Sequence, residues 1–241
     1  MKALYMKNSY LKEFETVVKS VKDGKFVVLE ETAFYPSSGG QAHDTGTIKR
    51  ISDDKSFKVV YAGKFSGDIS HEVECPDGEE LKEGDSVKCT IDWERRYKLM
   101  RSHTAAHVIS SIIHRKTGAM ITGNQLKTDK CRIDFSLEDY DPYVMEGFVK
   151  KADEEAAKGV PVEISFISRE DAENEESLSL LAKGLPGSIK EIRIVDIKGI
   201  DRQADGGTHV KNTKEIGKIN FIKCENKGKN NRRVYFSLGD R

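Results

Sequence analysis

The sequence changes its pattern abruptly at Asp92-Trp93, and this change constrains the fold more than any other feature. Residues 94–116 contain neither glycine nor proline, and Gly118 stands where a helix would end. Apolar side chains recur in this stretch at helical spacing, namely Leu99, Ala105, Val108, Ile109, Ile112 and Ile113. We therefore expect a long helix that begins a second domain, with the boundary at residue 92.

Short β-prone runs fill the residues before this boundary. Residues 14–18 and 25–29 flank Asp23-Gly24, which is a typical hairpin turn. Further runs follow at 46–48, 57–61 and 86–91. Many short strands at close spacing favour a small barrel or sandwich over residues 1–92.

The residues after the boundary combine helical and strand patterns. We expect helices over 143–158 and near 173–183. The expected strands are 131–135, 162–167, 192–197, 218–222 and 233–236. Residues 93–241 are therefore predicted to form an α+β domain.

Composition limits the classes to which this protein can belong. Its 241 residues include 40 Lys and Arg against 40 Asp and Glu, which excludes a uniformly basic nucleic-acid-binding protein. No apolar run approaches the roughly 18 residues of a membrane span, and charges begin too early for a signal peptide. The cysteines are scattered without a Cys-x-x-Cys pair, as is typical of reduced thiols. We expect a cytoplasmic protein whose partner is neither a membrane nor DNA.

Two histidines, His103 and His107, lie four residues apart on the predicted helix. This spacing stacks both imidazoles on one face, as in helices that offer two nitrogens to one metal ion. Metalloprotease helices carry a Glu base directly after the first histidine, but Thr104 stands there, so a protease would lack its base. The alternative is two histidines that share this spacing by chance.

A loop in the second half of the chain can supply further ligands. Residues 205–209 read Asp-Gly-Gly-Thr-His, and paired glycines permit a tight loop that aims Asp205 and His209 at one point. Because a zinc site takes four ligands, or three and a water, the loop and the two helical histidines together predict a His₃Asp site. The alternative is an ordinary Gly-Gly turn between strands.

A segment rich in Gly, Pro and Ser interrupts the strand-rich region at residues 32–46. It contains Gly39-Gly40-Gln41, followed by Asp44. An ordinary surface loop has a similar composition.

Taken together, the three motifs resemble those of the AlaX family of freestanding alanyl-tRNA editing proteins. The motifs are His103-x-x-x-His107, Asp205-Gly-Gly-Thr-His209-Val and Tyr35-Pro-x-x-Gly-Gly-Gln-x-x-Asp44-x-Gly46. The resemblance runs from about Thr32 to Tyr235 and extends to the editing domains of alanyl-tRNA and, more distantly, threonyl-tRNA synthetase. It implies the longer AlaX type: a β-barrel domain over 1–92, then an α+β zinc-binding domain over 93–241 of the threonyl/alanyl-tRNA synthetase second-additional-domain type.

The resemblance implies hydrolysis of the ester that joins serine, or as a second candidate glycine, to tRNA(Ala). One zinc ion per chain would be held by His103, His107 and His209, with Asp205 where the family commonly has Cys. A carboxylate is a harder ligand than a thiolate, so Asp205 either binds zinc or orients His209. Zinc would polarise the carbonyl, lower the pKa of a zinc-bound water or fix the substrate's amino group. No protein nucleophile is assigned, because an aminoacyl ester is already activated.

Substrate-binding residues follow from the same resemblance. Gly39, Gly40 and Gln41 would line the amino-acid pocket, where the Gln amide can hydrogen-bond a serine hydroxyl and alanine would leave it unsatisfied. Asp44 belongs to the same motif. Thr104, beside the first ligand, is a further candidate, and a solvent-facing helix residue is its alternative.

The zero net charge is a cancellation between segments. Residues 93–132 carry nine Lys/Arg against two Asp/Glu, residues 211–241 nine against three, and residues 138–176 four against thirteen. The basic segments adjoin the metal motifs, as contact with tRNA phosphates requires. The strongest phosphate-contact candidates lie at a predicted hairpin tip, namely Lys227, Lys229, Arg232 and Arg233. An unevenly charged solvated surface is the alternative.

Two other functions fit the same residues. One is a non-catalytic, zinc-stabilised tRNA-binding module, which the Asp205 departure favours. The other is a metallohydrolase acting on a different small ester or amide. The oligomeric state is left open.

Overall fold

The computed structural model of the chain describes residues 2–74, 76–138, 141–175, 178, 187 and 189–240. The chain divides into two compact units, Met1–Met100 and Arg101–Arg241. This division falls inside helix α1 (Trp93–Thr117), whereas the sequence pattern placed the boundary at residue 92, where that helix begins.

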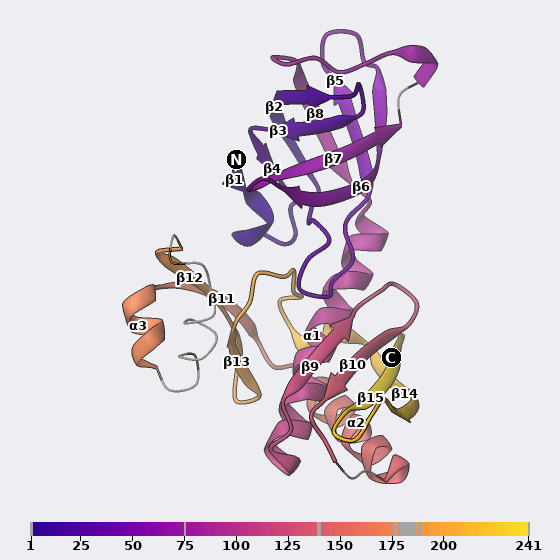
Figure 1. Cartoon of the computed structure of the whole chain (residues 1–241), viewed down its shortest axis with the longest axis vertical. Coiled ribbons are helices and arrows are strands. Elements are labelled where there is room, and N and C mark those ends of the chain that lie inside the picture. The colour runs from indigo at the N-terminus through magenta and orange to yellow at the C-terminus, as the bar shows by residue number, and fades with distance from the viewer. Residues whose placement is uncertain are drawn as a thin grey trace. The chain divides into compact units, whose positions relative to one another are not determined.

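The first unit is built around a closed barrel with the strand order β2-β3-β7-β6-β5-β8 (Figure 1). Its strands are β2 (Glu13–Lys22), β3 (Phe26–Leu29), β5 (Gly46–Arg50), β6 (Ser56–Phe65), β7 (Asp68–Glu74) and β8 (Ser86–Ile91). The short strands β1 (Lys2–Ala3) and β4 (Glu31–Thr32) form a separate parallel pair. The expected barrel is confirmed, and the sandwich alternative is wrong.

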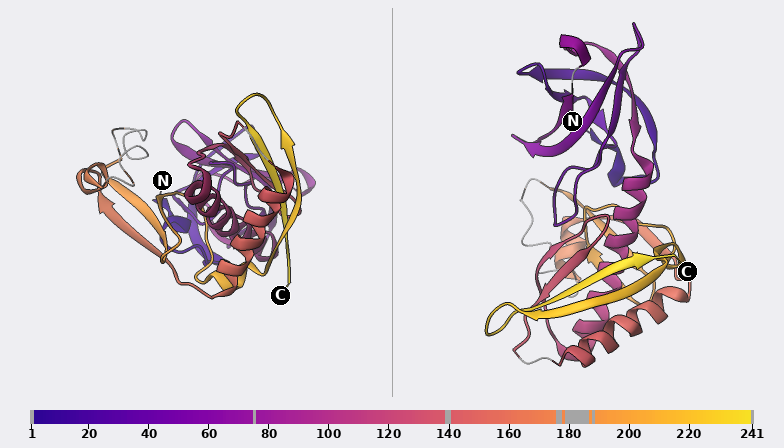
Figure 2. Two further views of the ribbon diagram at one scale, coloured as in Figure 1. Left: turned by 90° about the horizontal axis from the view of Figure 1, so that it is seen from below. Right: turned by 90° about the vertical axis from the view of Figure 1, so that its right-hand side faces the viewer.

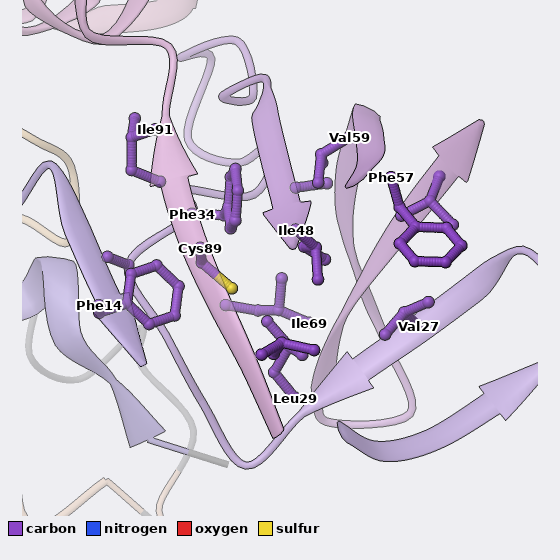
Figure 3. Close-up of a cluster of buried hydrophobic side chains, with 14 of the residues drawn as sticks. Phe14, Val27, Leu29, Phe34, Ile48, Phe57, Val59, Ile69, Cys89 and Ile91 are labelled. Carbon is purple, nitrogen blue, oxygen red and sulfur yellow. The ribbon is translucent and has the colours of Figure 1, made fainter. Parts of the chain in front are cut away.

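Alternating side chains explain why these segments close into a barrel. In β8, every second residue is buried, and strands β3 and β7 alternate in the same way. The inward side chains, among them Leu29, Ile48, Phe57 and Cys89, form one apolar core (Figure 3). Asp23 and Gly24 both have positive φ, at 53° and 68°, as the expected hairpin turn between β2 and β3 requires.

The second unit combines helices with two antiparallel sheets, as expected for an α+β domain (Figure 2). One sheet has the order β14-β15-β10-β9, and the other has the order β11-β12-β13. The elements are β9 (Ile121–Gln125), β10 (Cys131–Phe135), α2 (Pro142–Ala157), β11 (Val162–Ser168), α3 (Arg169–Asn174), β12 (Glu191–Ile197), β13 (Asp201–Ala204), β14 (Lys218–Asn226) and β15 (Arg232–Gly239). Three short 3₁₀ turns complete the described chain, at Leu4–Met6, Pro76–Gly78 and Thr213–Ile216.

Local signals account for the helix limits in this unit. Gly118, with φ 74°, follows the last turn of α1 in the left-handed conformation that ends many helices. Asp141 caps α2 by accepting from the backbone N–H of Tyr143 at 2.8 Å, and Pro142 occupies the first helical position. Most of the helix expected near 173–183 lies outside the described residues; α3 ends at Asn174.

Strands β9 and β13 were not predicted from the sequence. Strand β9 has no buried residue and includes Gly123, and all four residues of β13 are half-buried. Neither segment therefore has the apolar alternation by which a strand is recognised. Among the described helices, none is both long enough and apolar enough to cross a membrane.

Candidate metal centre

Helix α1 presents His103 and His107 one turn apart on the same face. Their ring centroids are 5.1 Å apart, and both side chains are buried. The adjoining faces of the helix are buried too, since they carry the buried side chains of Ala105, Val108 and Ile109. The pair is thus held at the surface of a packed helix with its nitrogens directed away from the helix axis.

The loop that follows β13 brings Asp205 and His209 to this pair. Asp205 Oδ2 accepts from the backbone N–H of Gly207 at 2.6 Å, which closes the loop tightly. A Cβ atom at position 207 would lie 2.1 Å from Cε1 of His103, so only glycine fits there. Buried Arg193 of β12 donates to the carbonyl of Asp205 at 2.7 Å and fixes the start of the loop.

The four candidate ligands converge on one point. One ligand atom from each of His103, His107, Asp205 and His209 lies within 4.8 Å of the others. Asp205 Oδ2 is 2.9 Å from Nε2 of His209, and Asp205 Oδ1 is 3.6 Å from Nε2 of His103. In a tetrahedral site with the usual zinc–ligand bond lengths, neighbouring ligand atoms are roughly 3.3 Å apart. Three imidazoles and a carboxylate at these separations fit a metal ion.

Two further side chains hold the imidazoles in place. Nδ1 of His107 is 2.8 Å from Oδ2 of Asp201, the first residue of β13. Nδ1 of His209 is 3.1 Å from Oγ1 of Thr104. Hydrogen bonds at Nδ1 fix each ring and leave Nε2 for a metal ion, an arrangement typical of metal-binding histidines.

Helix α1 also anchors the turn that carries Asp201. The hydroxyl of Ser111 donates to the carbonyl of Ile200 at 2.5 Å, and Arg115 donates to the same carbonyl. Asp201 was missed in the sequence. The available signal was a carboxylate four residues before Asp205, but its role depends on a strand that has no apolar pattern of its own.

The location of Thr104 rules out one of its two sequence-based interpretations. It is fully buried, so it is not a solvent-facing helix residue. Besides its contact with His209, its Oγ1 accepts from the backbone N–H of Val210 at 3.3 Å. The Thr104 side chain therefore connects α1 to His209 and Val210, the two residues at the end of the loop.

Burial and mutual contacts shift the pKa values in this cluster. Burial lowers the pKa of His103 well below its usual range and that of His209 to about 4. For His107, burial lowers the pKa, but the hydrogen bond to Asp201 and the negative charges of Asp205 and Asp201 together outweigh burial, and the pKa is raised. Burial would raise the pKa of Asp205, but the neighbouring His103 and His209 hold it well below its usual range. An ionised carboxylate and neutral imidazoles are the forms that bind metals.

The Gly-rich segment lies in the first unit and forms a two-residue turn. Ser38 and Gln41 exchange backbone hydrogen bonds of 3.2 and 3.0 Å around Gly39 and Gly40. Both glycines have positive φ, at 57° and 82°, and are exposed, whereas Gln41 is buried. The hydroxyl of Tyr35 donates to the carbonyl of Ser38 at 3.0 Å and thereby stabilises this turn.

Asp44 is fully buried, and its carboxylate contacts other residues of the first unit. Its carboxylate accepts from the guanidinium of Arg96 and from the backbone N–H of Tyr35, and both side chains of the ion pair are fully buried. Arg96 also donates to the carbonyl of Ser9 at 2.8 Å. Asp44 thus anchors the Gly-rich segment inside the first unit.

The basic hairpin tip also differs in part from its expectation. Arg232 has the same strand parity as the buried Val234, so its side chain turns inward, where it donates to the carbonyls of Gly228 and Asn231. Arg233 points to the opposite face and pairs with Asp134 at 2.7 Å. Lys227 pairs with Glu225 at 2.9 Å, and Lys229 is exposed.

Comparison with known proteins identifies first a class and then a family. Residues 192–235 match the family model of the threonyl and alanyl tRNA synthetase second additional domain, and residues 2–95 match that of tRNA synthetases class II (A). The α+β unit with its His₃Asp cluster is therefore of the threonyl and alanyl tRNA synthetase second-additional-domain type, as expected.

Full-length relatives define the family. An alanyl-tRNA editing protein AlaX-M of Methanosarcina barkeri is 53% identical over 99% of this chain and 99% of its own. A protein of the same name from Saccharolobus solfataricus is 42% identical over 98% of both chains. An alanine–tRNA ligase of Methanococcus vannielii is 38% identical over 98% of this chain, which covers 26% of the ligase. The chain belongs to the AlaX-M family of alanyl-tRNA editing proteins and is an enzyme of the aminoacyl-tRNA deacylase class, which confirms the resemblance.

Proposed function

We propose that this protein removes serine, and as a second substrate glycine, from mischarged tRNA(Ala) by zinc-dependent hydrolysis of the aminoacyl ester. The observation that carries the proposal is the convergence of three imidazoles and one carboxylate on one point in a chain of the AlaX-M family. The protein would act in trans, on tRNA released by the synthetase, and in the cytoplasm.

The donor set supports zinc as the metal. His103, His107, His209 and Asp205 would hold one ion per chain, since imidazole nitrogen and carboxylate oxygen are both zinc ligands. When bound, zinc supplies a Lewis acid that polarises an ester carbonyl and activates water at neutral pH. The close contacts of Asp205 with His103 and His209 favour a ligand role for this carboxylate over a purely orienting one.

The chain's own residues prepare the site for this chemistry. Asp201 and Thr104 hold His107 and His209 through their Nδ1 atoms, so the rings need no reorganisation when the ion binds. Burial of the cluster excludes bulk water, which strengthens every electrostatic interaction inside it. Because an aminoacyl ester is already activated, the proposal needs no protein nucleophile.

We further propose that Gly39, Gly40 and Gln41 contact the aminoacyl end of the substrate. The exposed turn supports this, because glycine backbone permits close approach and the turn is held rigidly by Tyr35 and the Asp44–Arg96 pair. Lys227, Lys229 and Arg233 remain proposed contacts for tRNA phosphates, whereas the inward side chain of Arg232 supports the hairpin itself.

The test is hydrolysis of Ser-, Gly- and Ala-tRNA(Ala) by the purified protein, loaded with zinc or treated with a chelator. We expect Ser-tRNA(Ala) to be deacylated, Ala-tRNA(Ala) to be spared, and activity to disappear with the metal and in His103→Ala. Wild-type activity in the metal-free protein would overturn the proposal. Retained tRNA binding with no turnover on any ester would instead identify a non-catalytic binding module.

A further inference from the structure

The four-stranded sheet of the second unit has two faces of opposite character. Cys131, Ile133 and Phe135 of β10 and Val234 and Phe236 of β15 are buried on the inner face. The residues between them alternate to the outer face, because successive side chains of a strand point to opposite sides. Among the described residues, the outer face carries no apolar core of its own.

Basic side chains occupy the middle of this outer face. The strand register aligns Lys223, Tyr235, Arg132 and Gln125 in one row across β14, β15, β10 and β9. The ammonium groups of Lys223 and Lys130 lie 5.1 and 5.3 Å from the centroid of the Tyr235 ring. Since an aromatic face attracts cations, Tyr235 holds two lysines close together that would otherwise repel each other. Both lysines are exposed.

The carboxylates on this face position the cations without neutralising them. Asp134 is shared between Arg132 at 2.8 Å and Arg233 at 2.7 Å. Glu225 is likewise shared between Lys223 and Lys227, at 2.5 and 2.9 Å. Because each carboxylate serves two cations, each group keeps a net positive charge. Lys130 adds a further charge and forms no ion pair with the described residues.

The basic face is connected directly to the helix of the metal cluster. The turn between β9 and β10 packs against α1, since the hydroxyl of Ser102 donates to the carbonyl of Lys127 at 3.4 Å. Ser102 directly precedes the candidate ligand His103. The thiol of Cys131 donates to the same carbonyl at 3.2 Å, which ties the turn to the sheet. A polyanion on this face would therefore be held beside the helix that carries two candidate ligands.

We propose that this basic sheet face, centred on Lys130, Arg132, Lys223 and Tyr235, is the docking surface for the phosphate backbone of the tRNA substrate. The inference rests on the proposed function and deepens it, because it places the partner of the same site. Charge complementarity selects the occupant: an RNA backbone presents evenly spaced negative charges, and the cations gathered on this face, namely Lys130, Arg132, Lys223 and Arg233, are suited to them. The acidic segment 138–176 would repel the same backbone and so favours this one face.

The test compares Lys130→Ala/Lys223→Ala with Lys150→Ala/Lys158→Ala, a matched control that removes two exposed lysines from α2 and its C-terminal end. Binding of uncharged tRNA(Ala) is measured by fluorescence over a range of salt concentrations. We expect the first variant to bind about tenfold more weakly or worse, and its slope of log K against log[salt] to fall by about 2, one for each lost phosphate contact. The control should keep the wild-type slope.

The outcomes separate this inference from the proposed function. If the Lys130/Lys223 variant keeps the wild-type affinity and salt slope, the sheet face is not the docking surface, whether or not the protein deacylates tRNA. A different result is that the wild-type protein deacylates no ester, while the Lys130/Lys223 variant binds tRNA more weakly and the control variant does not. In that case the docking surface stands and the proposed hydrolysis fails. With active enzyme, the same variant should raise KM for Ser-tRNA(Ala) by the factor seen in binding.

Discussion

Two buried histidines, His71 in the barrel and His209 in the second unit, share an electrostatic signature but differ in their surroundings. Burial lowers the pKa of each to about 4. Both ring nitrogens of His71 are occupied by the chain itself, at 2.9 Å from the carbonyl of Val27 and from Oγ1 of Thr32. The nitrogens of His209 likewise meet Thr104 and Asp205, at 3.1 and 2.9 Å. Unlike that of His71, however, the ring of His209 also faces two further imidazoles, those of His103 and His107, whose centroids are 4.4 and 4.8 Å away. A lowered pKa therefore marks burial, whereas converging ligand atoms mark a site.

Two carboxylates, the fully buried Asp44 and the half-buried Asp205, also differ in their surroundings. Asp44 meets a guanidinium and a backbone N–H, which are donors that complement it completely. Asp205 also meets a backbone N–H, that of Gly207, and lies 3.8 Å from the guanidinium of Arg193, but unlike Asp44 it lies against imidazoles as well. Donors alone therefore do not distinguish the two carboxylates; what distinguishes Asp205 is the convergence of three imidazoles beside it, a set of ligand atoms that a metal ion can bind.

The largest expected effect separates the two histidines directly. His209→Ala removes a candidate ligand, so we expect deacylation of Ser-tRNA(Ala) to fall by about 10³-fold or more, since a Lewis acid contributes several kcal/mol to such a reaction. His71→Gln, which keeps hydrogen-bonding groups in the barrel, should retain metal and activity. Metal content by mass spectrometry and single-turnover rates give the readout. Equal losses of metal and activity in both variants would show that His209 is no more a metal ligand than His71.

A smaller effect is expected in the pH dependence of stability. His71 has a pKa of about 4 in the folded chain and 6.5 in the unfolded one, so the unfolded chain binds the proton more readily. Its contribution is complete above about pH 6.5 and is lost as the pH falls towards 4. The loss amounts to about 3 kcal/mol, at 1.36 kcal/mol per pKa unit. The free energy of unfolding, measured with urea, should therefore fall less steeply with decreasing pH in His71→Gln than in the wild-type protein. Parallel plots of this free energy against pH would contradict the role assigned to His71.

The smallest effect concerns the residue that orients His107. Asp201→Asn removes the charged hydrogen-bond partner of Nδ1, and such changes typically weaken metal binding by about 10–100-fold. Asp196→Asn is the matched control, because Asp196 lies on the preceding strand and pairs with Lys198. Zinc affinity from competition with a chelating dye measures the difference. Unchanged affinity in Asp201→Asn would mean that the ring of His107 is positioned by packing alone.

Much of the fold could be predicted because its signals are local. The helix that became α1 has no breaker and ends at Gly118, and the β2–β3 hairpin has the turn residues that its geometry demands. Strands β9 and β13 escaped prediction, since they derive their order from their neighbours in the sheets. Their side chains contain no pattern that a single segment could reveal.

The site was predictable to the extent that its members lie within short motifs. His103 and His107 are related by one helical turn, and Asp205 and His209 by one tight loop, so spacing alone suggested both pairs. The supporting roles of Asp201 and Thr104 depend on contacts between distant segments. The same holds for the structural contacts of Asp44, whose partner Arg96 lies 52 residues further along the chain.

The close approach of Gly207 to His103 has a consequence for engineering the loop. The shape of the loop depends on the absence of a side chain at position 207, whereas position 205 contributes a candidate metal-ligand oxygen. The donor can therefore be exchanged for another of similar reach, while the backbone position admits no substitute. A saturation library over the loop should tolerate variety at one position and glycine alone two residues later. Position 205 is therefore the position at which a substitution can change the metal preference of the site while the loop keeps its shape.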